Sequence, residues 1–240
     1  MVRNVGVTMR NLASALFVAG LAFLLLVLTG AFEFGAPPMR VGQAILGVAP
    51  SEVGAANLVT SVVLAYRGFD TLGELSILFA AATAGGFVLG RHQVRRRGGE
   101  AGFILRTGAD LLFPLLLVVG LYIVLHGHLT PGGGFQGGVI LATAFFLPVL
   151  ARPSSPLDHG WLSLVEGLAG AGFIAIGILA LYRGGEFLQP FLDKGQLGSL
   201  LSAGTLPVLY LAVGLKVGAE LAGLLARLAE PGESAGEGAA

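Results

Sequence analysis

One stretch decides how this chain folds: Leu129-Thr130-Pro131-Gly132-Gly133-Gly134-Phe135-Gln136-Gly137-Gly138. It lies between two apolar runs, 111–125 and 139–150, and five of its ten residues are glycine. In a helix interior glycine costs about 1 kcal/mol and proline about 3 kcal/mol relative to alanine, so ordinary helix is not expected across this string. We predict a break in which the backbone unwinds or packs closely against another helix. The alternative is an exposed tight turn of a helical hairpin.

The composition is that of an all-α integral membrane protein. Of the 240 residues, 55% are hydrophobic and only 12% are charged, whereas soluble domains carry about 25% charged residues. Basic and acidic residues balance to a net charge of zero, which gives no indication of a nucleic-acid partner. The chain has no cysteine, so disulfides, thiolate metal sites and cysteine-ligated iron–sulfur clusters are excluded.

Six apolar segments approach the roughly 20 residues that a transmembrane helix needs. They span residues 11–30, 71–90, 109–125, 137–151, 161–182 and 205–225. The fourth is short, so we expect it to be completed through the glycine-rich stretch. Arg3 and Arg10 before the first segment resemble a signal peptide, but no small-residue cleavage site follows, so we expect a retained span. The prediction is about six transmembrane helices with a glycine-rich break before the fourth.

The region between the first two spans is harder to interpret. Residues 31–50 have the composition of a loop, and Ser51 is a plausible N-cap for a helix that begins there. Residues 57–66 are apolar but cover only about half a membrane, so we expect them to lie in the interface or to enter partway. The alternative is one long tilted helix that continues through Arg67 and Asp70.

The distribution of lysine and arginine predicts the orientation in a cell membrane. Nine basic residues fall on one side and four on the other, which places both termini in the cytoplasm and the glycine-rich stretch outside. The first group is Arg3, Arg10, Arg91, Arg95, Arg96, Arg97, Arg106, Arg152 and Arg227, and the second is Arg40, Arg67, Arg183 and Lys194. The tail 229–240 is rich in Gly, Ala, Ser and Glu and is expected to be disordered.

Charges within membrane spans are candidates for function, because each costs about 2.5–3.5 kcal/mol at a helix centre. Glu74 follows Arg67 and Asp70 at helical spacing, so all three are expected on one face. They form either a proton-titrating cluster or a structural ion-pair group at a helix start, where acids also suit the helix dipole.

Lys216 lies near the middle of the sixth span, and Glu220 lies one turn further along. The two can neutralise each other at i,i+4, and a buried lysine suits proton relay; an internal salt bridge is the structural alternative. Glu166 is a further candidate in the fifth span, and its role stays open. Asp110 is interpreted as a structural helix cap.

His126 and His128 flank the glycine-rich break. A third metal ligand is absent nearby, so a metal site is not expected, and His126 is interpreted as an interfacial residue or a proton acceptor. His92 and His159 are expected in cytoplasmic loops with no role. The sequence contains no nucleotide-binding loop, nucleophile triad or haem motif, which favours a transporter component without cofactor over an enzyme.

Two motifs carry a family resemblance. The string His126-Gly127-His128 followed by 129–138 strongly resembles the signature of the B subunit of Mrp-type (also called Mnh-type) multisubunit sodium/proton antiporters. The string Tyr66-Arg67-Gly68-Phe69-Asp70-Thr71-Leu72-Gly73-Glu74 resembles a segment near the C-terminus of the large antiporter A subunit. It also resembles a separate small subunit of membrane-bound hydrogenases with Mrp-like modules. The resemblance implies a two-span unit at 1–98, a four-span B-like domain at 99–228 and the tail at 229–240.

The resemblance also implies a function. We expect a membrane subunit of a monovalent cation (Na+)/proton antiporter that assembles with other subunits. Glu74 corresponds to the acidic position of the Phe-Asp-Thr-Leu-Gly-Glu motif and is the expected ion- or proton-path residue. The path candidates are Asp70, Glu74, His126, Glu166, Lys216 and Glu220. The alternatives are a non-transporting scaffold, a subunit of a hydrogenase-type complex, and an independent small transporter or channel.

Overall fold

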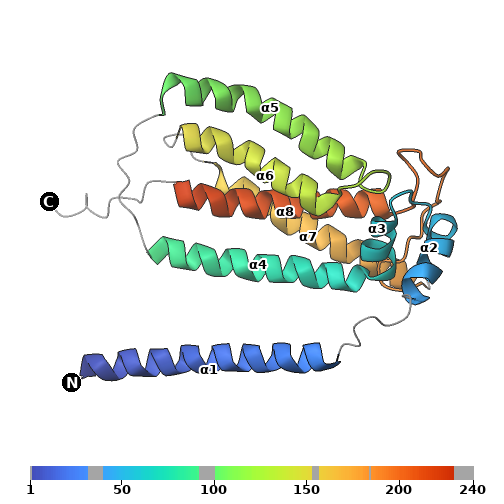
Figure 1. Ribbon diagram of the computed structural model, residues 1–240. Helices are drawn as coiled ribbons and strands as arrows, with labels where there is room; N and C mark the ends of the chain where they lie inside the picture. The colour runs from blue at the N-terminus through green and yellow to red at the C-terminus, as the bar shows by residue number, and fades with distance from the viewer. Residues whose placement is uncertain (1, 32–39, 92–100, 153–156, 184, 230–240) are drawn as a thin grey trace. The chain divides into compact units, whose positions relative to one another are not determined.

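A computed structural model describes residues 2–31, 40–91, 101–152, 157–183 and 185–229 as helices and loops, with no strand among them (Figure 1). Six of the helices are long and apolar enough to cross a membrane, which confirms the expected fold class. They are α1 (Val2–Ala31), α4 (Gly68–Arg91), α5 (Phe103–Leu125), α6 (Gly134–Ala151), α7 (His159–Tyr182) and α8 (Leu206–Ala229). Most of the tail expected to be disordered lies outside the described residues.

The chain divides into two compact units, residues 1–43 and 44–240. The first contains α1, whose apolar part Asn11–Ala31 is long enough to span a membrane. The second contains the other five long helices. Within it α4 packs on α8, although the sequence places these helices in different units, and the division of the sequence near residue 98 stays a prediction.

Helix α8 lies at the centre of the second unit. Helices α4, α6 and α7 pack directly on it, and α5 packs mainly on α6 (Figure 1). Because successive helices alternate in direction, residues 126–133 and 185–205 lie together at one end, here called the Gly-loop end. The opposite end contains the end of α8 and the start of α7 and is called the Arg227 end. A path along α8 would therefore run between the Gly-loop end and the Arg227 end.

The glycine-rich break is shorter than the sequence suggests. Gly132 and Gly133 have φ angles of 134° and 128°, which suit glycine, but α6 begins at Gly134. Unwound backbone is therefore limited to the first half of the string. In the second half the close-packing alternative holds, and the short fourth span is completed through the glycines as expected. A Cβ at Gly137 would lie 2.4 Å from Val124 Cγ2, and one at Gly138 would lie 2.9 Å from the Gly214 carbonyl oxygen. Close packing against α5 and α8 offsets the low helix propensity of these glycines.

The segment before α4 forms a bent pair of helices rather than a loop. Helix α2 (Arg40–Val53) meets α3 (Leu58–Thr60) and the π-helix η1 (Ser61–Tyr66) at an angle of 93°. The expected loop at 31–50 is thus wrong from residue 40 onward, because burial of Ala49 and Val53 outweighs local propensity.

Ser51 does not cap a new helix but lies in the last turn of α2, where its Oγ donates to the Val48 carbonyl over 2.8 Å. Residues 58–66 form the short helical segment that their length predicts. The long-helix alternative is wrong, because the helix is interrupted at Arg67, whose φ is −128°.

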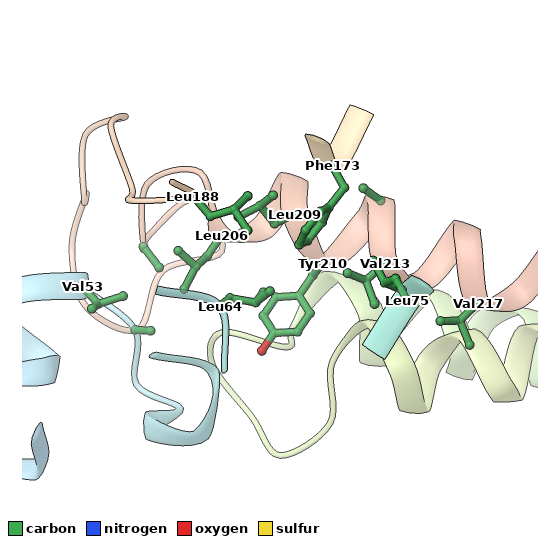
Figure 2. Close-up of a cluster of buried hydrophobic side chains, with 13 residues drawn as sticks. Val53, Leu64, Leu75, Phe173, Leu188, Leu206, Leu209, Tyr210, Val213 and Val217 are labelled. Carbon is green, nitrogen blue, oxygen red and sulfur yellow. The ribbon is translucent and has the colours of Figure 1, made fainter. Parts of the chain in front are cut away.

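Apolar side chains fill the bundle along the first half of α8. Figure 2 shows Leu209, Tyr210, Val213 and Val217 in line on this helix, close to Phe173 of α7. Further members of the cluster come from other elements: Leu64 of η1, Leu75 of α4 and Leu188 of the 185–205 loop. The core therefore seals the half of the bundle that faces the Gly-loop end.

The close approach of α6 predicts the effect of one substitution. Gly137→Val would place methyl groups against Val124 and the Gly120 carbonyl, and overpacking of this kind costs about 1–3 kcal/mol. We expect a clearly lower thermal unfolding midpoint in detergent. Gly172→Val is the control, because a Cβ at Gly172 in α7 meets nothing within 4 Å. Equal midpoints for the two variants would contradict the packing argument.

Candidate functional site

A buried lysine stands between two carboxylates in the middle of α8. Lys216 Nζ lies 3.2 Å from Glu166 Oε1 of α7 and 3.3 Å from Glu220 Oε2 one turn along α8. Lys216 is 9% exposed and Glu220 is 5% exposed. The i,i+4 pair is the one that the spacing predicts, and the structure adds Glu166 to it. We call these three residues the Lys216 cluster.

Two features of neighbouring helices make room for this lysine. A Cβ at Gly170 would lie 3.4 Å from Lys216 Cδ, so the glycine lets the aliphatic stem pass close to α7. From α4, the ring of Phe79 faces the ammonium, with Nζ 5.1 Å from the ring centroid. A cation over an aromatic face is stabilised by the ring quadrupole. Gly170 therefore gives the stem room, and Phe79 gives the ammonium an aromatic neighbour.

A cavity of 380 Å³ opens beside the cluster, between α4, α7 and α8. Glu166 and Glu220 line it, and so do His159 and Arg227 at the Arg227 end of the bundle. His159 begins α7 instead of lying in a loop without contacts, as the sequence suggested. Thr83 of α4 and Ser163 of α7 add hydroxyl groups to the walls. A polar cavity of this size can hold several water molecules within hydrogen-bonding reach of the carboxylates.

Asp70 and Glu74 lie apart from this cluster. Asp70 pairs with Arg67, but both side chains remain more than half exposed. Glu74 is exposed on α4, whereas the next residue, Leu75, points into the core and is 2% exposed. The predicted shared face of Arg67 and Asp70 is therefore present, but the structure does not bring Glu74 to Lys216.

The loop after α5 is held by a polar network that the sequence did not reveal. Asn57 Nδ2 donates to the carbonyl oxygens of Gly127 and Thr130 over 2.8 and 2.9 Å. Thr60 Oγ1 donates to the same Gly127 oxygen over 2.6 Å, and Tyr210 O–H donates to Thr60 over 2.6 Å. Asn57 also caps α3, since its Oδ1 accepts a hydrogen bond from the Val59 N–H over 3.1 Å. The network joins the bent segment, the glycine-rich loop and α8.

The two loop histidines have different surroundings. His126 stacks on Tyr122 with ring centroids 4.0 Å apart, and its Nδ1–H donates to the Tyr122 carbonyl. His128 is fully buried and its Nε2 lies 3.3 Å from the Ser199 carbonyl oxygen. Burial, which outweighs this hydrogen bond, holds the pKa of His128 below its usual range. No group of three or more His, Cys, Asp or Glu side chains among the described residues could hold a metal ion.

The expectation that Asp110 caps a helix is wrong, because α5 begins at Phe103 with Gly102 at its N-cap and Asp110 lies two turns inside it. Both oxygens accept hydrogen bonds from the guanidinium of Arg152, over 2.8 and 2.6 Å. This bidentate pair ties the start of α5 to the end of α6. Fork-to-fork geometry of this kind fixes orientation as well as adding energy.

Comparison with known proteins identifies related chains. Residues 104–223 match a family described as "Domain related to MnhB subunit of Na+/H+ antiporter". The chain is 35% identical over 196 residues to an uncharacterized protein of Methanocaldococcus jannaschii, covering 70% of this chain and 74% of that protein. It is 34% identical over 98 residues to a Staphylococcus aureus protein whose name describes antiporter subunit mnhB2, covering 38% of this chain and 67% of that protein.

Two solved structures are similar over nearly the whole chain. A chain of the membrane-bound sulfane sulfur reductase, an archaeal respiratory membrane complex, gives a TM-score of 0.74 at 38% identity, covering 92% of this chain and 98% of that one. A chain of the Mrp complex from Dietzia sp. gives a TM-score of 0.70 at 23% identity, covering 95% of this chain and 27% of that one. The second likeness concerns the fold alone.

The burial of His128 predicts a pH dependence of stability. Because the pKa of His128 is lowered in the folded chain, the unfolded chain takes up the proton first, near pH 6.5. Stability should therefore be constant above about pH 6.5 and fall as the pH drops below it. Unfolding midpoints at pH 7.5 and 5.5 measure this. His128→Gln should flatten the dependence, and the control His126→Gln should retain it; a slope that His128→Gln leaves intact would refute the assignment.

Proposed function

The chain belongs to the family of domains related to the MnhB subunit of Na+/H+ antiporters, and we propose that it is a transporter subunit that contributes part of a proton path. The observation that carries the proposal is the Lys216 cluster beside its polar cavity. The residues of this cluster lie within the matched region 104–223. Burying one ammonium and two carboxylates inside a membrane is costly, and such groups mark ion or proton paths. Packing alone would be served better by apolar side chains.

The partners of this chain are other subunits of a membrane complex. Glu74 supports this inference, because it lies within the span α4 and is exposed on the surface of the chain. A carboxylate in that position is stabilised by a neighbouring protein helix rather than by lipid. We propose that Glu74 continues the path into a neighbouring subunit, while the Lys216 cluster serves the interior of this one.

The orientation follows from the distribution of basic residues. The positive-inside rule places the Arg227 end in the cytoplasm and the Gly-loop end outside the cell membrane. The cavity beside the Lys216 cluster then faces the cytoplasm, and Glu74 lies toward the external side. With this arrangement, ions or protons would pass between subunits at the level of Glu74, toward the external side.

A second candidate function is a scaffold that assembles the complex without carrying ions. The separation of Glu74 from the Lys216 cluster favours it, since the described residues offer no continuous line of ionisable groups from one to the other. The parent complex is an antiporter in the proposal. The likeness to a subunit of a respiratory sulfane sulfur reductase supports a related assembly as the alternative.

The substitution Glu74→Gln separates these functions. In vesicles holding the whole complex, we expect sodium-dependent proton flux to fall at least about tenfold, because the amide cannot exchange a proton. Assembly is checked on a native gel. The matched control is Glu186→Gln, an exposed glutamate in the loop between α7 and α8, which should retain full flux. Normal flux in an intact Glu74→Gln complex would overturn the path role and favour the scaffold.

A further inference from the structure

The Lys216 cluster carries one negative charge too many for a buried site. Two carboxylates, Glu166 and Glu220, share the single ammonium of Lys216. The other charged or titratable residues that line the adjoining cavity are His159 and Arg227, and α4 contributes none to its wall. Arg227 lies seven residues along α8 from Glu220, about 10 Å of helix away, and does not pair with the cluster directly. The cluster itself keeps a net negative charge, which is unfavourable within the membrane and favours uptake of one positive charge.

Glu220 is the carboxylate placed to take up that charge. Its side chain is 2% exposed, and its Oε1 accepts no hydrogen bond from any residue in the described part of the chain. Glu166, by contrast, accepts a hydrogen bond from Lys216 Nζ and is 21% exposed. Burying a charged carboxylate oxygen that accepts no hydrogen bond is unfavourable. Protonation of the carboxylate removes the charge and with it this cost.

A proton fits this position better than an alkali cation. A bound cation requires several oxygen ligands around it, as the coordination of hard metal ions illustrates. Lys216 Nζ, itself positively charged, lies 3.3 Å from Glu220 Oε2, so a second cation there would be repelled. A proton needs only one oxygen.

Access to this carboxylate is one-sided. The cavity extends from Glu166 and Glu220 to Arg227, seven residues along α8, or about 10 Å of helix. Toward the Gly-loop end, Val213 and Val217 of α8 and Phe173 of α7 belong to the buried apolar cluster (Figure 2). Water can therefore approach the cluster from the Arg227 end, and the apolar core blocks the other direction.

We propose that Glu220 binds one exchangeable proton, which reaches it through the cavity from the Arg227 end. A hydronium ion in the cavity gives its proton to the Glu220 carboxylate and becomes water, and the Lys216 ammonium stays paired with Glu166. The inference rests on the proposed transporter function and names its ion, its binding residue and its side of access. Labelling of the site tests it without measuring flux, so its failure is distinguishable from failure of the function.

The first experiment tests access on the whole complex in sealed vesicles of both orientations. Because the chain has no cysteine, Ser163→Cys places a single thiol of this chain in the cavity wall. A membrane-impermeant, charged thiol reagent should label it at least tenfold faster from the Arg227 side, as read by mass spectrometry of the peptide. Leu168→Cys, on the exposed surface of α7, is the control and should not react from either side. Labelling of Ser163→Cys from the Gly-loop side, or from neither side, would overturn the passage.

The second experiment identifies the bound ion in the unmodified complex. Dicyclohexylcarbodiimide reacts with protonated carboxyl groups in apolar surroundings, so Glu220 should be modified, and the modification should fall at least tenfold as the pH is raised. Added sodium chloride at constant pH should leave the rate unchanged. Protection by sodium would identify a cation site, and absence of modification at every pH would exclude an exchangeable proton; either result overturns the proposal. No substitution of Glu220 is needed, so folding of a variant does not affect the outcome.

Discussion

The close approach of α6 to α8 is the constraint on which the rest of residues 44–240 depends. Side chains at Gly134 and Gly138 would collide with Val213, Val217 and the backbone of α8, so only glycine allows this spacing. With α6 so close, α8 has neighbours around most of its surface, and α4 and α7 pack on its remaining faces. Polar residues on α8 then cannot reach lipid or bulk water and must be satisfied by neighbouring helices.

Burial of α8 explains why its charges are grouped. An isolated Lys216 inside this bundle would carry an uncompensated charge, which typically costs 3–5 kcal/mol when one partner of a buried pair is removed. Glu166 and Glu220 provide the compensation from α7 and from α8 itself. The same arrangement leaves Glu220 Oε1 without a partner among the described residues. Oε2, 3.3 Å from Lys216 Nζ, also accepts no hydrogen bond there. The packing that stabilises the lysine therefore leaves a buried carboxylate for which protonation is favourable.

Local sequence patterns predicted the helices. They did not predict which residues far apart in the sequence pair with each other. Hydropathy predicted the six long helices, and i,i+4 spacing predicted the contact between Lys216 and Glu220. The pairing of Glu166 with Lys216, 50 residues away, depends on which face of α7 meets α8, and no local signal encodes that face. The capping of the Gly127 carbonyl by Thr60 depends likewise on tertiary packing. Helix α2 was missed because residues 31–50 have the composition of a loop, and only Ala49 and Val53 of this helix are buried.

The Lys216 cluster and Glu74 have different surroundings within the membrane-spanning helices. This difference favours an assembly of several subunits. The Lys216 cluster finds its compensation within the chain, apart from one charge, and water reaches it from one end only. Glu74 has no compensating partner among the described residues of 44–240, because α4 turns it outward while Leu75 enters the core. A carboxylate inside the membrane is costly against lipid, and the proposal that a neighbouring subunit pairs with Glu74 meets that cost. The surface that binds that neighbour and the route for protons between subunits would then be the same surface.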